Sequence, residues 1–260
     1  MKCIVVIPTY NERDNIARLV PQIVGFDFHV LIVDDNSPDG TGDLADQLAC
    51  GHPRIDVIHR PAKQGLGTAY VRGFQYALEQ GADLTCQMDA DFSHDPRDLR
   101  RLLEAMKDND VAIGSRYVAG ARTENWGLLR KLMSRGANLY TRAILGLPLH
   151  DCTSGFKCFR REALSSLNLD GTSSSGYSFQ IEVNYRCWRK GYRLGEVPIT
   201  FRGRGVGESK MSSAIFFEAM LLVWRLRWER LCRSALHLTR SLGFRADTGD
   251  RAGEREKSLP

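Results

Sequence analysis

The sequence lacks a long hydrophobic run and any paired cysteine motif. No apolar stretch reaches the roughly 18 residues of a membrane-spanning helix, and the six-residue run near the amino terminus is too short for a signal peptide. The seven cysteines are odd in number and contain no CxxC pair, which argues against a disulfide framework and a zinc ribbon. We therefore expect a chain without a signal peptide or a transmembrane helix, located in a reducing compartment such as the cytoplasm.

A strong excess of charge is also missing. The 36 Lys and Arg residues exceed the 31 Asp and Glu residues by enough for a net charge of +5, which suits an anionic ligand such as a phosphate or a lipid headgroup. We expect no nucleic-acid partner. With 260 residues, 43% of them hydrophobic, the chain can form one large α/β domain with its own core, or a domain with an appendage.

Strand and helix patterns alternate through the first 115 residues. Short β-branched runs predict strands, with amphipathic helices between them, at 4–7, 30–33, 55–58, 84–88 and 110–114. The first strand stops at Pro8, Asn11 can cap the following helix, and Pro96 sits at a helix start. The fold class predicted is α/β, with a doubly wound, mostly parallel sheet.

The pattern is looser beyond residue 115. It predicts a loop at 117–126, a helix at 128–145, strands at 154–159 and 195–201, and a helix at 211–236. We place a catalytic domain at 1–210, an amphipathic interfacial helix region at 211–242 and a disordered tail at 243–260. Residues at spacings of four and three form one apolar face of that helix region, which suits a membrane interface or packing on the catalytic domain: Phe217, Leu221, Trp224, Trp228 and Leu231.

Three acidic loops should meet at one edge of the sheet. PTYNE, VDDNSPDG and MDADFSHD each follow a strand, and ligands of such sheets bind outside the carboxyl ends of the strands. Asp89 and Asp91 would repel by roughly 4 kcal/mol at about 4 Å and a dielectric near 20. A solvated turn would relieve this, but the position at a strand end favours a Mg²⁺ or Mn²⁺ bridge to a phosphate.

Two other phosphate-binding motifs fail. GLGTAY resembles a dinucleotide fingerprint but ends in Tyr70, and the first strand's loop lacks glycine. GRGVGESK has no Gly-Lys-Ser/Thr, so it is not a Walker-type loop. A hydride-transfer enzyme and an NTPase are therefore disfavoured.

An ordered set of motifs over residues 1–215 resembles one enzyme family. The set is IPTYNERDNI, VDDNSPDGTG, GLGTAYVRG, MDADFSHDP, GSRYVAG, ENWGLLRKLMSRGAN, SGFKCFRREAL and GESKM. It is similar to dolichyl- or polyprenyl-phosphate mannose synthases, inverting glycosyltransferases of family 2. The resemblance implies the GT-A fold, a Rossmann-like mixed sheet.

The resemblance also implies roles for individual residues. Nucleotide-sugar contacts fall on Pro8, Tyr10, Glu12, Val33, Asp35, Asp89, Ala90, Asp91, Arg204 and Lys210. The metal motif falls on Asp89 and Asp91, with Ser93 a weaker ligand than the glutamine of some relatives. The acceptor-phosphate region falls on Arg116, Arg130 and Ser134. The residues that carry catalysis are Asp91, Arg116, Arg130, Arg204 and Lys210.

The implied reaction moves mannose from GDP-mannose to a polyprenyl monophosphate, with inversion. A phosphate dianion needs cations and a metal, Mg²⁺ or Mn²⁺, more than a strong base. Glu182 is a structural carboxylate in preference to a base, and His94 has two open roles, at the diphosphate or in a turn. Because a polyprenyl acceptor lies in a membrane, the resemblance implies peripheral membrane association, either through the helix at 212–231 or through a membrane partner subunit. A UDP-glucose-type transferase and a non-catalytic scaffold subunit are the alternatives.

Overall fold

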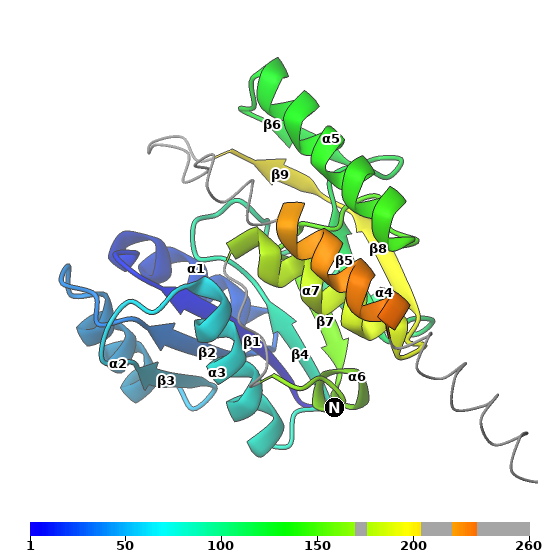
Figure 1. The fold of residues 1–260 in the computed structure, drawn as a ribbon. Helices are drawn as coiled ribbons and strands as arrows, with labels where there is room; N and C mark the ends of the chain where they lie inside the picture. Colours follow the sequence, from blue (N-terminus) through cyan, green and yellow to red (C-terminus); the bar gives the residue numbers. More distant parts are fainter. Residues whose placement is uncertain (170–175, 204–219, 233–260) are drawn as a thin grey trace, which may run out of the picture.

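A seven-stranded mixed sheet forms the centre of the molecule (Figure 1). The computed structural model describes residues 1–169, 176–203 and 220–232. Across the sheet the order is β3 (Ile55–His59), β2 (His29–Asp34), β1 (Cys3–Thr9), β4 (Leu84–Gln87), β7 (Lys157–Arg160), β5 (Val111–Ser115) and β8 (Leu194–Pro198). Only β7 runs antiparallel to its neighbours, which confirms the predicted mostly parallel α/β sheet.

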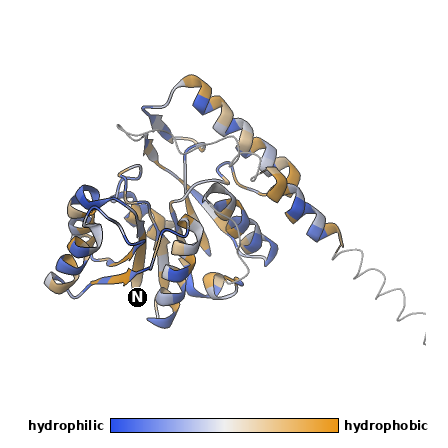
Figure 2. Cartoon of the chain, turned by 60° about the vertical axis from the view of Figure 1, so that its left-hand side comes forward, coloured by the Kyte–Doolittle hydropathy of each residue, from blue (hydrophilic) through white to orange (hydrophobic). Residues whose placement is uncertain are grey.

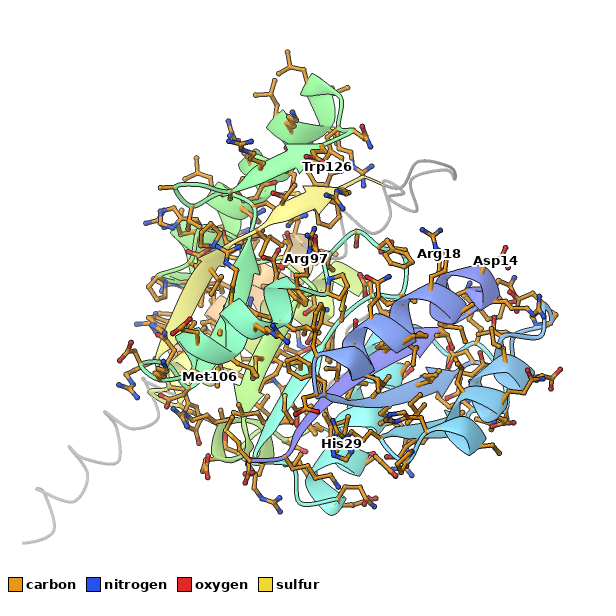
Figure 3. The ribbon with its side chains drawn as sticks, turned by 180° about the vertical axis from the view of Figure 1, so that it is seen from behind. Asp14, Arg18, His29, Arg97, Met106 and Trp126 are labelled. Carbon is orange, nitrogen blue, oxygen red and sulfur yellow. The ribbon has the colours of Figure 1, made fainter. Side chains whose placement is uncertain are left out.

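Helices cover both faces of this sheet. The helices are α1 (Arg13–Gly25), α2 (Thr41–Gly51), α3 (Leu66–Glu79), α4 (Asp98–Ala105), α5 (Leu128–Leu145), α6 (Arg161–Ser165) and α7 (Gly176–Arg189), with a further helical stretch at 220–232. Apolar side chains of α1 and α4 fill the core on one face, seen in front in Figure 3. Those of α3, α6, α7 and the 220–232 helix fill the core on the other face.

A small second sheet extends the molecule beyond the carboxyl ends of β5 and β8. It pairs β6 (Arg122–Glu124) with β9 (Thr200–Arg202), and α5 lies beside it at the top of Figure 1. The prediction of a loop at 117–126 was therefore incomplete. The prediction of one strand at 195–201 was wrong, because the buried Ile199 passes the chain from β8 into the second sheet, where its carbonyl accepts the Arg122 N–H.

Two predictions about the segment where β1 leads into α1, those for Pro8 and Asn11, were wrong. The first strand continues through Pro8 to Thr9, because pairing with β4 ends at Val6 and the missing proline N–H removes no bond from that ladder. Asn11 does not cap α1: it has a φ of 59°, and Glu12 holds the cap position. Asn11 and Glu12 thus form the turn that leads from β1 into α1.

Other boundaries moved by a few residues. Helix α4 begins at Asp98, after a turn that contains Pro96, and β7 covers 157–160 in place of the predicted 154–159. Of the predicted helix at 211–236, residues 220–232 are helical and the rest lie outside the residues that the structure describes. Within the described ranges, no helix has both the length and the apolar character to cross a membrane.

Close packing of α3 on the sheet generates a stability prediction. A Cβ on Gly73 would lie 2.3 Å from Val6 Cγ1, whereas a Cβ on Gly136, in the middle of α5, would meet nothing within 4 Å. Gly73→Ala should lower the free energy of unfolding by about 1–3 kcal/mol through overpacking. Gly136→Ala should raise it by about 0.5–1 kcal/mol. Urea denaturation measures both, and equal shifts for the two variants would contradict this packing.

Candidate active site

The loops after β1, β2 and β4 lie side by side, because these three strands are neighbours in the sheet. The strands end at Thr9, Asp34 and Gln87, so PTYNE, VDDNSPDG and MDADFSHD leave from one edge. The expected meeting of the three acidic loops is therefore present in the fold.

The two aspartates at the end of β2, Asp34 and Asp35, have different partners. Asp34 accepts hydrogen bonds from the Thr9 and Ser37 hydroxyls at 3.0 and 2.6 Å, which fixes the turn. Asp35 is buried 3.2 Å from the Arg60 guanidinium and accepts the Gln64 N–H. Burial raises the pKa of Asp35, and the charge of Arg60 opposes that rise. Asp35 is therefore a carboxylate held at the rim of the acidic edge.

Tyr10 offers an aromatic face beside this carboxylate. The Lys63 ammonium lies 4.0 Å from the centre of the Tyr10 ring, a cation–π contact. Glu12, two residues after Tyr10, accepts a hydrogen bond from the Asn15 amide at 2.6 Å. Pro8 and Val33 are buried register partners on the neighbouring strands β1 and β2. A ring, a carboxylate and an ammonium together suit a nucleobase and its ribose.

Asp89 and Asp91 leave the end of β4 in separately fixed orientations. The fully buried Tyr70 donates its hydroxyl to Asp89 Oδ1 at 2.7 Å, and the Ser93 N–H donates to Asp91 Oδ1 at 3.0 Å. Between them Ala90 is buried, and Phe92 has a φ of 56°, which a bulky residue adopts only in a tightly constrained loop.

These carboxylates fit a hard divalent cation. Among the described residues, no cluster of three His, Cys, Asp or Glu ligand atoms includes Asp89 or Asp91, so ligand oxygens are needed to complete the coordination of Mg²⁺ or Mn²⁺. The Ser93 hydroxyl is buried beside them without a hydrogen-bond partner among the described residues, and so keeps a free oxygen for the ion or for water.

A buried network of two amides and the Lys157 ammonium lies near Asp89. Lys157 is fully buried and donates to Gln180 Oε1 at 2.8 Å, which also accepts the Gln87 amide at 2.9 Å. Burial lowers the pKa of Lys157 to about 7. At Gly155 a Cβ would lie 3.5 Å from Asp89 Oδ2 and 3.7 Å from Gln180 Nε2, so both side chains border the same small space beside Gly155.

Arg116 is buried in an ion pair at the far side of the edge. It donates two hydrogen bonds to Asp151, both 2.7 Å, and a third to Thr153. Burial acts to raise the pKa of Asp151, but Arg116 and its hydrogen bonds bring that pKa below its usual value. The guanidinium also lies 5.4–5.5 Å from the rings of Tyr117, Trp126 and Phe201.

A second cationic position lies on α5. The Arg130 guanidinium is 4.5 Å from the Trp126 ring, labelled near the top of Figure 3, and its buried Nε has no partner among the described residues. Tyr117 donates its hydroxyl to Ser134 at 2.6 Å. The structure thus brings the three predicted acceptor-phosphate residues, Arg116, Arg130 and Ser134, around shared aromatic side chains.

Comparisons with known proteins agree with this geometry. Residues 4–167 match the profile described as Glycosyl transferase family 2. The chain belongs to glycosyltransferase family 2. It is 46% identical over 87% of its length to the polyprenol monophosphomannose synthase of Mycolicibacterium smegmatis, of which 88% is covered. It is 47% identical over 89% of its length to the undecaprenyl-phosphate mannosyltransferase of Micrococcus luteus, of which 98% is covered.

Solved structures share the fold at low sequence identity. The glucosyl-3-phosphoglycerate synthase of Mycobacterium tuberculosis, in complex with Mn²⁺, UDP and its product, has a TM-score of 0.63 and 18% identity. The match covers 85% of this chain and 77% of that one. The predicted GT-A-like fold is thereby confirmed. The family match and the two named relatives show that the chain is a glycosyltransferase.

Sequence reasoning missed several residues of this family 2 site. Tyr70 was noted only because it spoils a dinucleotide fingerprint, yet its position in GLGTAY is what brings it to Asp89. Arg60 and Lys63 come from RPAKQ, the loop after β3 on the same edge, which was a usable signal. Asp151 gave no signal, because it lies 35 residues from Arg116. Arg204 and Lys210 lie outside the described residues, so their roles stay predictions.

His94, whose role was left open, lies in the apolar floor of the site. Its ring stacks on Phe156 with centres 4.9 Å apart, and its Nδ1 is buried without a partner among the described residues. Burial lowers its pKa to about 4, against an ordinary value of 6.5, despite the opposing charge of Asp91. His94 is therefore neutral at physiological pH and packs as a ring.

The buried His94 predicts a pH dependence of stability. The unfolded chain takes up this proton near pH 6.5 and the folded chain near 4, so stability is lost as the pH falls through that window. The loss attributable to His94 is on the order of 3 kcal/mol. Chemical denaturation at pH 7, 5.5 and 4 should show a shallower decline for His94→Leu than for the wild type. Parallel curves would contradict a neutral buried ring.

Proposed function

We propose that this family 2 glycosyltransferase moves mannose from GDP-mannose to a polyprenyl monophosphate, with inversion at the anomeric carbon. The observation that carries the proposal is the 46–47% identity, over most of the chain, to two enzymes named for mannose transfer to polyprenyl phosphates. A relative from Pyrococcus furiosus, 38% identical, is named a dolichol-phosphate mannosyltransferase, and the match covers 65% of its length.

The side chains suit a phosphate nucleophile. A phosphate monoester is largely a dianion at neutral pH, so its oxygen can attack the anomeric carbon without a strong base. Glu182, the one acidic candidate for a base in the sequence of α7, is buried and paired with Arg186 one turn away on the helix. That pairing supports a structural carboxylate and an acceptor that arrives already ionised.

Arginines would receive the acceptor phosphate. Arg130 keeps an unpartnered buried N–H among the described residues, and Ser134 lies one turn further along α5. Arg116 holds its positive charge in place through Asp151, so little reorganisation is needed when a second anion approaches. These groups offset the repulsion between the acceptor phosphate and the donor diphosphate.

Asp89 and Asp91 would hold the divalent ion of the donor. Mg²⁺ or Mn²⁺, when bound, neutralises the diphosphate and stabilises it as a leaving group. The two carboxylates are fixed from separate directions by the Tyr70 hydroxyl and the Ser93 N–H. Tyr10, Lys63 and Asp35 would bind the base and ribose at the other end of the same edge.

The acceptor would be reached at a membrane surface. The first half of α5, which carries Arg130 and Ser134, exposes a set of large apolar side chains, as does the 220–232 helix. Figure 2 colours hydrophobic residues along both helices. They are Leu128, Leu129, Leu132, Met133, Leu221, Trp224, Trp228 and Leu231, each between 47% and 74% exposed. Apolar side chains next to a phosphate site suit the interface where a lipid headgroup lies.

Transfer to lipid tests the function. Purified protein with Mg²⁺ or Mn²⁺ should move label from GDP-mannose, and much less from UDP-glucose, into a polyprenyl phosphate, and NMR should show a β-linked product. Asp91→Asn should lower kcat at least 100-fold, because the leaving diphosphate loses a carboxylate-held ion. Asp95→Asn, a change of the same kind in a residue paired with Arg97 on this loop, should retain activity. No transfer from GDP-mannose to any isoprenoid phosphate would overturn the proposal.

Vesicle binding tests the membrane contact. Leu129→Ser combined with Leu132→Ser should reduce flotation with anionic phospholipid vesicles several-fold, because each leucine contributes about 1.5–3 kcal/mol when fully buried in an apolar phase. Leu66→Ser, which changes an exposed leucine at the start of α3 instead of one on α5, should float like the wild type. Unchanged flotation of the double variant would place the membrane contact elsewhere.

A further inference from the structure

Three buried cysteines from three strands meet on the sheet face that α1 and α4 cover. They are Cys3 at the start of β1, Cys86 on β4 and Cys158 on β7. Their sulfur atoms all lie within 4.8 Å of one another, and Cys3 Sγ and Cys86 Sγ are 3.7 Å apart. The proposed transfer reaction uses none of them.

The sheet register brings these sulfurs together. Cys86 pairs directly with Cys158 across the antiparallel β4 and β7. On the other side Cys86 pairs with Val5, so Cys3 lies two residues away on the same face of the sheet. Three neighbouring strands thus each direct one thiol to a common point.

The spacing matches a three-coordinate metal site. A metal–sulfur bond of about 2.3 Å places the three sulfurs of a trigonal site about 4 Å apart. The observed sulfur separations lie around this value, so small side-chain rotations would suffice. A disulfide between Cys3 and Cys86 fits less well, because their offset of two residues on neighbouring strands separates the Cα atoms by about 8 Å.

We propose that Cys3, Cys86 and Cys158 form a binding site for a soft cation of low coordination number, of which Cu⁺ is the best fit. Sulfur ligands select soft ions. Zn²⁺ takes a fourth ligand, usually a side chain or water. Here Cys86 and Cys158 have no exposed surface, Cys3 is 7% exposed, and within the described ranges no His, Asp or Glu joins the cluster.

The site is separate from the acidic edge and has an entry side. Cys86 precedes Asp89 by three residues, so sulfur ligands in the sheet and oxygen ligands beyond its end select ions of different hardness. Cys3 begins β1 and is next but one to the exposed Met1. Figure 1 marks the amino terminus at this end of the sheet. Local opening of these first residues would admit an ion.

A competition assay tests this site without reference to transferase activity. Fully reduced protein is titrated anaerobically with Cu⁺ held by a chromophoric chelator, and the protein should withdraw one equivalent per chain. Cys3→Ser and Cys158→Ala should lose that equivalent. Cys3 is the first residue of β1, so Cys3→Ser still tests Cu⁺ binding if Cys158→Ala does not fold. The double variant Cys50→Ser, Cys232→Ser removes the two exposed cysteines and should behave like the wild type.

Each other result overturns the proposal. Failure of the wild type to withdraw Cu⁺ removes the site, and retention of the equivalent by Cys3→Ser places it elsewhere. Loss in the Cys50→Ser, Cys232→Ser variant assigns the uptake to surface thiols. Uptake of one equivalent of Zn²⁺ in place of Cu⁺ overturns the choice of ion.

Bound Cu⁺ should also raise the midpoint temperature of thermal unfolding of the wild type and leave that of Cys3→Ser unchanged.

Discussion

The buried ion pair between Arg116 and Asp151 is the interaction on which the proposed acceptor-phosphate region of the site depends. It joins the end of β5 to the loop after α5, and the aromatic rings of Trp126 and Phe201 pack around it from two further segments. Removal of either partner would leave a buried charge uncompensated. The pair therefore fixes a positive charge where the acceptor phosphate is proposed to bind.

Four aspartates at one edge of the sheet organise the region of the site that is proposed to bind the donor. Asp34, Asp35, Asp89 and Asp91 lie at or just beyond the carboxyl ends of β2 and β4, the two strands that flank β1. Each is held by groups that offset its charge or orient its oxygens. Their fixed positions mean that a cation bridging to a diphosphate would meet ligands already in place. Preorganised charge of this kind is usually the largest contribution to transfer catalysis.

The cations around Arg116 and the aspartates at the sheet edge together suit the proposed phosphate acceptor. An acceptor that arrives as a dianion needs fixed cations, and the structure provides Arg116 and Arg130 on the side of the edge opposite to Asp35 and Tyr10. The exposed leucines of α5 lie on the same helix as Arg130, so the chain presents apolar surface and phosphate ligands together. A lipid phosphate at a membrane surface combines these two features.

The sequence by itself determined the alternating α/β architecture and the acidic loops, because strand runs and the turns after them are local in the chain. Asp35, Asp89 and Asp91 were therefore predictable as edge residues. Only the tertiary structure decided which partner each one has. Asp34 and Asp35 are indistinguishable as letters, yet one bonds Thr9 and the other Arg60. Tyr70 reaches Asp89, Asp151 reaches Arg116, and three distant cysteines meet, because strand order and register set contacts between residues far apart in the chain.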